Sequence, residues 1–436
     1  MKKNSFPHNS SLSMLIFVAW RNIWRNKVRS ALTLSALSGG LAMLIAYTTL
    51  LDGMVRQMSD FTTNISKGHI QIHYDAFIQD QDIYATIPWN KLDALKKDFA
   101  DITFSPRLYG AALASSGDVS SGVMLKAVSH SDENRVTTML SHIKDGVADL
   151  SPISDDSELE SFSVVVGSRL AKNMGLKPGS EVVLVSQAAD GSIGNGLFYV
   201  SGILKPIEPT FDRTGILLSI EAFQSLMFLT SGAHEIAISA PRSELIELKK
   251  RLQSTFQDYE NTIGPSDDLS GKVVVRTWKE LVPAVSDMIE MSKAAIYILG
   301  IIMLGLASMG MTNTILMSVF ERKHEFGVLL SLGMNKYLLL LMIMLEAIFI
   351  SCIAAVVGSL VGIYSSLWLE KSGINFSAFM PEGFDYGGVI FEPIWRGHLN
   401  VDSIYISIIL MFILAIIASL IPSWKTVRLK PVEAMR

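Results

Sequence analysis

Four long apolar stretches restrict how this chain of 436 residues can fold more than any other feature. A helix needs roughly 20 consecutive apolar residues to cross the hydrocarbon core of a bilayer. Residues 31–51, 294–320, 337–369 and 403–421 meet that requirement and predict four transmembrane helices. The third stretch is long enough to be tilted or to project beyond the bilayer. With 49% hydrophobic and 18% charged residues, the chain is too apolar for one soluble domain and too charged to lie wholly in lipid.

The distribution of basic residues predicts the orientation of these helices. Residues 1–30 carry six basic and no acidic side chains, whereas residues 370–402 carry five acidic and two basic ones. Because cytoplasmic segments are enriched in lysine and arginine, we expect 1–30, 321–336 and the tail 422–436 in the cytoplasm. Residues 52–293 and 370–402 then lie outside. The net charge of −4 adds nothing to this assignment.

The first 30 residues predict an amphipathic helix on the cytoplasmic leaflet. A signal peptide is excluded because the apolar run 14–20 is short and its basic residues follow it. Both tryptophans, Trp20 and Trp24, fall on one apolar face, as is typical of an interfacial helix. The alternative is a basic flank that only fixes topology. The apolar face comprises Ile16, Phe17, Trp20, Ile23 and Trp24, and the polar face comprises Arg21, Asn22, Arg25, Asn26 and Arg29.

The segment 52–293 predicts a large mixed α/β extracytoplasmic domain inserted between the first and second transmembrane helices. Residues 64–74 alternate as a strand, 164–166 form a buried strand, and 220–229 are typical of a helix. The only cysteine, Cys352, lies in the third span, so this domain depends on packing and not on a disulfide.

Helical spacing continues beyond both neighbouring spans, which predicts two amphipathic stalks; ordinary packing at the base of the domain is the alternative. The residues that keep this spacing are Leu51, Met54, Val55, Met58, Phe61 and Ile65 after the first span, and Leu281, Val285, Met288 and Ile289 before the second.

The sequence offers no site for nucleotide chemistry. The nearest match to a phosphate-binding loop, residues 264–273, has its glycines too far apart and Val273 where a magnesium-binding hydroxyl belongs. His69 and His73 would share a strand face, but no third metal ligand accompanies them. No catalytic set and no basic nucleic-acid surface stand out. We expect no enzyme activity, no metal and no cofactor on this chain, with any ATP hydrolysed by a partner.

Glu346 is the one ionisable residue within a predicted span. A carboxylate in that position is costly, so it predicts a functional role, although a protonated or hydrogen-bonded contact between helices is the alternative. Gly358 and Gly362 form a G-x-x-x-G pair in the same span and favour close helix contact within or between subunits. Gly39 and Gly40 belong to similar small-residue pairs in the first span.

Residues 321–336, "ERKHEFGVLLSLGMNK", form a charged segment between two apolar spans. They predict a short helix that ends at Gly333 as its C-cap. Glu321 and Glu325 lie one turn apart, and Phe326, Leu329 and Leu330 supply an apolar side. Such a helix can seat in the groove of a soluble partner.

This segment resembles the coupling helix of ABC-transporter permeases of the FtsX-like/MacB type, which includes the lipoprotein-releasing (Lol) permeases. "AWRNIWRNKVRSALT" resembles the family's amphipathic first helix and first span, and "VVVGSRLAKNMGLKPGSEVVLVS" resembles its periplasmic domain. "LEAIFISCIAAVVGSLVG" is similar to its third span, and "SLIPSWKTVRLKPVEAMR" to its C-terminal tail. The likeness covers nearly the whole chain.

The resemblance implies a four-span permease of the bacterial inner membrane, paired with itself or a paralogue and with two cytoplasmic ATPase subunits that bind ATP and magnesium. It implies mechanotransmission, in which movement of the coupling helix is passed to the periplasmic domain. On this basis we expect ATPase coupling through Glu321, Arg322, Glu325, Phe326, Gly327, Leu330 and Gly333.

The resemblance implies several functions. Release of lipoproteins or other amphipathic substrates is the first expectation, with membrane lipid and a periplasmic carrier as partners. MacB-like efflux with a membrane-fusion protein and FtsX-like activation of envelope hydrolases are the alternatives. The chain departs from MacB because no ATPase domain is fused to it. It departs from carrier-docking Lol permeases because residues 187–197 contain glycines and no proline.

Overall fold

The computed structural model describes residues 8–153, 161–263, 272–332, 334–380, 384–386, 389–391 and 393–427. The chain divides into two compact units. The helical unit comprises Met1–Arg56, Ile289–Phe379 and Ile394–Arg436, and the α/β unit comprises Gln57–Met288 and Met380–Pro393.

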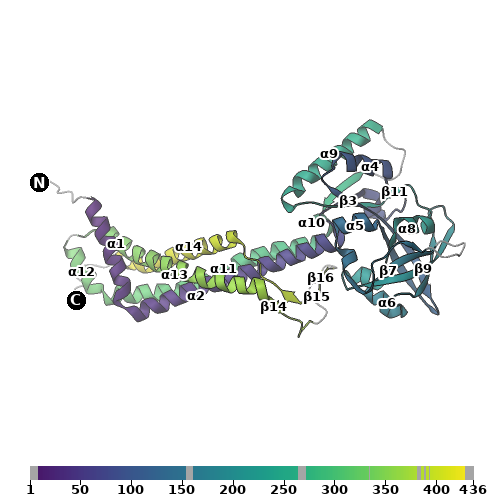
Figure 1. Cartoon of the computed structure of the whole chain (residues 1–436). Coiled ribbons are helices and arrows are strands. Elements are labelled where there is room, and N and C mark those ends of the chain that lie inside the picture. The colour runs from purple at the N-terminus through teal and green to yellow at the C-terminus, as the bar shows by residue number, and fades with distance from the viewer. Residues whose placement is uncertain are drawn as a thin grey trace. The chain divides into compact units, whose positions relative to one another are not determined.

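The helices of the first unit pack around an apolar core. In the described ranges, four of them are long and apolar enough to cross a membrane: α2, α11, α13 and α14. Leu41 and Ile45 of α2, Leu304 of α11 and Met411 of α14 are buried in this core, and α13 packs along both α14 and α1 (Figure 1). The bounds are α1 His8–Arg25, α2 Lys27–Asp60, α11 Pro283–Glu321, α12 Lys323–Ser331, α13 Lys336–Ser372 and α14 Val401–Val427.

The ends of these helices follow from local sequence. Asn335 caps α13, since its side chain accepts a hydrogen bond from the Tyr337 backbone N–H at 3.0 Å. α2 continues into a π-helix, Phe61–Lys67, which ends at Gly68 with φ +79°. The helical spacing expected after the first span is confirmed. The spacing expected before the second span is wrong at Leu281, which belongs to a separate short helix. Pro283 lacks an N–H and restricts the residue before it, so α11 begins there.

Most strands of the α/β unit join one sheet, which has 11 strands among the described residues. Its main path is β13-β1-β12-β3-β4-β10-β7-β9-β5, with β6 paired to β7 and β8 to β3 and β9. The strand bounds are β1 Ile70–Tyr74, β3 Thr103–Ser116, β4 Val119–Val128, β5 Ile143–Gly146, β6 Pro152–Ile153, β7 Ser161–Val166, β8 Glu181–Gln187, β9 Ile193–Leu204, β10 Gly215–Ser219, β12 Glu235–Ser239 and β13 Val273–Thr277.

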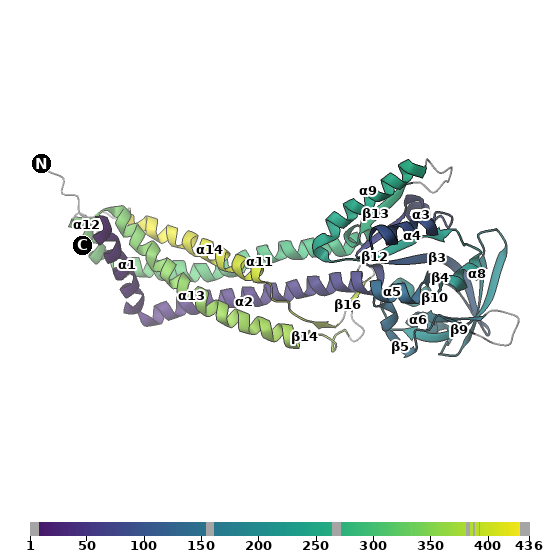
Figure 2. The ribbon, with the colours of Figure 1, turned by 45° about the horizontal axis from the view of Figure 1, so that its top comes forward.

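Helices cover this sheet and bury its apolar side chains. α8 packs against β3 and β4, as Figure 2 shows, and Phe223 of α8 lies in the same core as Leu125 and Val164. The helix bounds are α3 Asp75–Asp80, α4 Trp89–Asp98, α5 His130–Val136, α6 Ser168–Met174, α7 Pro209–Thr214, α8 Ile220–Met227, α9 Leu245–Ile263 and α10 Trp278–Leu281, with 3₁₀ turns Met139–Ser141 and Arg242–Glu244. Short strand pairs are β2 Ile87–Pro88 with β11 Gly232–Ala233, β14 Ile374–Asn375 with β17 Ile394–Trp395, and β15 Phe384–Tyr386 with β16 Val389–Phe391.

The expected strands are confirmed by β1 at 70–74 and by β7 at 164–166, and the expected helix is confirmed by α8. The strand expected over 64–74 is wrong at 64–67, because the helix of the first span continues through these residues as the π-helix Phe61–Lys67. Residues 187–197, which correspond to the hook of carrier-docking permeases, comprise the end of β8, the turn 188–192 and the start of β9. Gln187 pairs with Ile193 across this turn, and Gly191 supplies a left-handed residue with φ +85°.

Candidate functional site

A cluster of arginine and glutamate side chains joins α12 to the helices around it. Arg25 ends α1, Arg29 lies in the first turn of α2, and Glu321 ends α11. Arg322 is the N-cap residue of α12, which also carries Glu325. Glu346 lies in α13. We call this set the arginine–glutamate cluster, and its members are Arg25, Arg29, Glu321, Arg322, Glu325 and Glu346.

The outer part of the cluster consists of two ion pairs at the surface. Arg25 Nη1 lies 2.9 Å from Glu325 Oε1, and Arg29 Nη1 lies 2.8 Å from Glu321 Oε2. Glutamates 321 and 325 are about half exposed, so each pair stabilises the structure by roughly 0.2–1 kcal/mol. Their main effect is on the position of the helices. One pair joins the end of α11 to α2, and the other joins α12 to α1.

Arg322 is the buried centre of the cluster. Its Nε donates a hydrogen bond to Glu325 Oε2 at 2.9 Å, and its Nη1 lies 3.8 Å from Glu346 Oε2. Its guanidinium also lies 5.0 Å from the centre of the Phe326 ring, a cation–π contact. The hydrogen bond from Arg322 is the largest influence on Glu325 and holds the pKa of its carboxyl below the usual value, and a second hydrogen bond from Arg25 acts in the same direction. One planar guanidinium thus links α12 to the carboxylate of α13.

Phe326 does not lie on the presented side of α12, contrary to the sequence-based expectation. It is 1% exposed and belongs to the same apolar core as Leu339 and Met342 of α13. Burying the ring removes a large apolar surface from water and anchors the helix. Gly327 is also buried, and Leu330 is half-buried. Gly333 lies outside the described residues; the C-cap of α12 is Leu332.

The exposed side of α12 is a different stripe from the one expected. It contains Glu321 at the end of α11, the α12 residues His324, Glu325 and Val328, and the C-cap residue Leu332. Val328 and Leu332 were not singled out in the sequence, although they follow Glu325 by three and seven residues, a spacing that places all three on the same helical face. We call this set the α12 stripe. It combines two carboxylates with exposed aliphatic side chains, which suits a groove on another protein.

The apolar face expected for the first helix is divided in two. Ile23 is buried with Leu15 and Ala19 in the core of the helical unit. Trp24 is 53% exposed, and the Trp20 ring packs edge-on against Phe349 of α13 with centroids 5.7 Å apart. One side of the helix is therefore buried in the helical unit, while Trp20 contacts α13 from the aromatic side and Trp24 stays exposed. Phe17 and Arg21 are likewise exposed.

The glycines singled out in the sequence have different surroundings. A Cβ atom on Gly358 would lie 2.8 Å from the Ser38 carbonyl oxygen, and one on Gly362 would lie 3.0 Å from Ile45, so both glycines allow α13 to approach α2. A Cβ atom on Gly40 of α2 would lie 3.2 Å from the Ala307 Cβ of α11. A Cβ atom on Gly39, by contrast, would have no neighbouring atom within 4 Å among the described residues.

His69 and His73 are buried next to or within β1. Burial lowers the pKa of His73 to about 4 and also lowers the pKa of His69. Where the structure is described, no group of three histidine, cysteine, aspartate or glutamate side chains is arranged to hold a metal ion.

A buried ion network in the α/β unit was missed in the sequence. Arg107 of β3 donates to Glu133 of α5 at 2.6 Å and to Glu235 of β12 at 2.7 Å, and its side chain is fully buried. Burial opposes ionisation of Glu133, but Arg107 and Lys126 lower its pKa to about 2. The network holds one helix against two adjacent strands. Its partners lie 26 and 128 residues from Arg107 in the chain, too far apart for a sequence pattern to show.

Two protein-family models match this chain. The MacB-like periplasmic core domain matches residues 30–254, and the FtsX-like permease C-terminal domain matches residues 297–431. The second match covers the segment 321–336 and Glu346, and the first begins within α2. The family models therefore cover both units of the structure.

Individual relatives are distant in sequence. An uncharacterized ABC transporter permease of Methanocaldococcus jannaschii is 25% identical over 246 residues, and the match spans about half of each protein, 55% of this chain and 55% of the relative. The lipoprotein-releasing system transmembrane protein LolC of Xylella fastidiosa strain Temecula1 is 19% identical over 433 residues, covering 94% of this chain and 95% of LolC. The crystal structure of the periplasmic region of MacB from Actinobacillus actinomycetemcomitans is 11% identical and covers 51% of this chain and 94% of that one, with a TM-score of 0.34.

The two family-model matches agree with the resemblance found in residues 321–336 and along the chain. The chain belongs to the ABC-transporter permeases of the FtsX-like/MacB type.

Proposed function

We propose that this chain is a permease subunit that works by mechanotransmission, driven by ATPase subunits on separate chains. The observation that carries the proposal is the arginine–glutamate cluster. Arg322 and Glu325 of the α12 segment contact α1 and α13, and Glu321 contacts α2. A force applied to α12 therefore reaches these helices through direct polar contacts and through the buried Phe326 ring. Coupling requires such a physically contiguous path.

The proposal includes an orientation. Residues 1–30, 321–336 and 422–436 lie in the cytoplasm, and the α/β unit lies in the periplasm, inserted between the first and second spanning helices of an inner-membrane protein. The basic residues of the cytoplasmic segments support this arrangement. The chain acts as a dimer, with itself or a paralogue, on two ATPase subunits that hold ATP and magnesium.

The proposed substrates are lipoproteins or other amphipathic molecules. Support comes from relatives named as lipoprotein-releasing system transmembrane proteins, which align over nearly the full length of this chain. MacB-like efflux is the second candidate, because the MacB-like periplasmic core model matches 30–254. The β8–β9 turn, which contains glycine and no proline, favours a partner other than a hook-docked carrier.

Reconstitution tests the proposal. The full chain and the ATPase that co-purifies with it are placed in proteoliposomes that contain an acylated lipoprotein, and release into solution is measured with and without ATP. We expect ATP-dependent release that stops when the ATPase is made unable to hydrolyse ATP. Release of a soluble peptide but not of the lipoprotein would support efflux instead, and no transport of either would contradict a transport function.

A further inference from the structure

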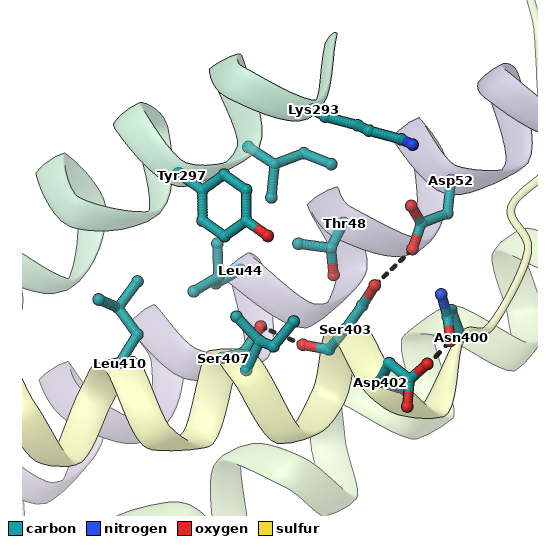
Figure 3. A pocket seen from close by; sticks show the side chains of 12 residues that line it. Leu44, Thr48, Asp52, Lys293, Tyr297, Asn400, Asp402, Ser403, Ser407 and Leu410 are labelled. Atoms are coloured by element: carbon teal, nitrogen blue, oxygen red, sulfur yellow. Dashed lines mark hydrogen bonds between the residues drawn. The ribbon is translucent and has the colours of Figure 1, made fainter. Parts of the chain in front are cut away.

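A cavity of about 240 Å³ lies in the helical unit at the end opposite to α12. α2, α11 and α14 line it, as the close view in Figure 3 shows. Its volume is several times the roughly 30 Å³ that one water molecule occupies in the liquid, and it lies below the usual range of about 300–1,000 Å³ for drug-sized ligands. The space therefore suits a small head or a chain segment of a larger amphiphile, not a folded protein.

The cavity changes in polarity along the helices. Asp52, Lys293 and Asp402 line its outer end, and each lies one residue beyond a predicted apolar span. Leu44 and Leu410 line its inner end. Each leucine is eight residues from the acidic residue of its own helix, or about 12 Å at 1.5 Å per residue. A polar mouth above an apolar floor matches the polarity of a lipid that has its headgroup at the bilayer surface.

The charges at the mouth have both signs. The Asp52 carboxylate accepts a hydrogen bond from Ser403 Oγ at 2.6 Å, and in Figure 3 the Lys293 ammonium points toward Asp52. The mouth thus offers two carboxylates and one ammonium. A headgroup with both an ammonium and a phosphate matches this set, with its ammonium on the carboxylates and its phosphate on Lys293. A purely anionic headgroup would place its phosphate against two negative charges.

Hydroxyl groups continue the polar lining inward. Thr48 and Ser407 lie between the charged mouth and the leucine floor, and the Ser407 hydroxyl is satisfied by the Ser403 carbonyl oxygen at 2.7 Å. The side chain of Tyr297 also lines the cavity and is 52% exposed. An aromatic ring with a polar tip is a common neighbour of a lipid headgroup.

We propose that this cavity binds the headgroup and first methylene groups of a phospholipid with a primary ammonium, at the outer-leaflet end of the helices. The site requires that α2, α11 and α14 lie in a membrane. Lipid binding in this cavity does not require ATP coupling or a lipoprotein substrate. If the lipid does not bind, the proposed function is therefore not contradicted.

The test uses the full chain in nanodiscs made from equal amounts of phosphatidylethanolamine and phosphatidylglycerol. After extraction in mild detergent, the lipids that remain bound are quantified by mass spectrometry. We expect phosphatidylethanolamine to be retained about threefold over phosphatidylglycerol, a ratio that one partly exposed ion pair can supply. Asp52→Asn combined with Asp402→Asn should abolish the preference. Lys371 lies near the C-terminal end of α13 and does not line the cavity, so Lys371→Gln should keep the preference.

A second measurement needs no substitution and so does not depend on the folding of a variant. A phosphatidylethanolamine analogue with a photoreactive group near the start of its acyl chain is crosslinked to the wild-type chain, and the labelled peptides are sequenced. We expect labels on peptides that contain Tyr297 and Leu410. Equal retention of the two lipids, a preference that survives both Asn substitutions, or labels confined to other surfaces would overturn the proposal.

Discussion

Arg322 joins one outer ion pair of the arginine–glutamate cluster to α13, because its guanidinium contacts both Glu325 and Glu346. The pairs Arg25–Glu325 and Arg29–Glu321 join residues 300 and 292 positions apart, so local spacing does not reveal them.

The pair Arg29–Glu321 allows a charge-reversal test. Arg29→Glu places two carboxylates together and should lower the thermal stability of the purified chain by an amount equivalent to about 0.5 kcal/mol. The double variant Arg29→Glu/Glu321→Arg should restore most of it, as measured by the melting temperature. A double variant no more stable than the single one would show that the pair does not form.

The Arg107 network predicts a larger effect on stability. Arg107→Met leaves Glu133 and Glu235 buried without their cation, which should cost about 3–5 kcal/mol. Arg135→Met, an exposed arginine on α5, is the matched control and should change stability by less than about 0.5 kcal/mol. Chemical denaturation of the two variants measures the difference. Equal effects would contradict a stabilising role for the buried network.

The lowered pKa of Glu133 also predicts that the stability of the folded protein depends on pH. The folded pKa of this carboxyl, about 2, lies below its ordinary value of 4.5. A lowered carboxyl pKa stabilises the folded state above pH 4.5, and this contribution is lost as the pH falls toward 2. Between these values the wild-type melting temperature should fall more steeply than that of Glu133→Gln. Parallel curves for the two proteins would show that Glu133 is not the group responsible.

At the scale of elements, local patterns predict helices and strands well and predict their contacts poorly. Apolar length identified the four long helices. The alternation of Ile70 and Ile72 identified β1, although the structure buries all five residues of this strand, which pairs with β12 on one side and β13 on the other. Pro283 indicates the start of α11, but the helical spacing extends past it to Leu281. The burial of Phe326 was not readable, because its partners Leu339 and Met342 lie across a turn on another helix.

Substitution of Gly358, which lies in the contact between α2 and α13, should destabilise the protein more than substitution of Gly305 in α11. Gly358→Leu should separate the helices, since even its Cβ atom would lie 2.8 Å from a backbone oxygen of α2, and overpacking of this kind costs about 1–3 kcal/mol. Gly305→Ala, where the described structure shows nothing within 4 Å, should be neutral or slightly stabilising. Melting temperatures in detergent test this, and similar losses in both variants would contradict close packing at Gly358.

At the scale of the whole molecule, we propose that opposite ends of the helical unit have different tasks. In this proposal the α12 stripe binds a soluble ATPase, the arginine–glutamate cluster and Phe326 pass its force to α1, α2 and α13, and the cavity at the other end binds a lipid. The sequence predicted the first task through a family resemblance. It did not predict the cavity, which exists only where α2, α11 and α14 come together.

Transmission of force through the arginine–glutamate cluster can be measured as substrate released per ATP hydrolysed, in proteoliposomes that contain the chain and its ATPase. Arg322→Ala combined with Glu346→Ala removes the central link together with its buried carboxylate, and it leaves the α12 stripe in place. We expect ATP hydrolysis to continue while release per ATP falls at least about tenfold, a loss equivalent to roughly 1.4 kcal/mol of coupling. Lys371→Gln should match the wild type. An unchanged ratio in the double variant would contradict transmission through the arginine–glutamate cluster.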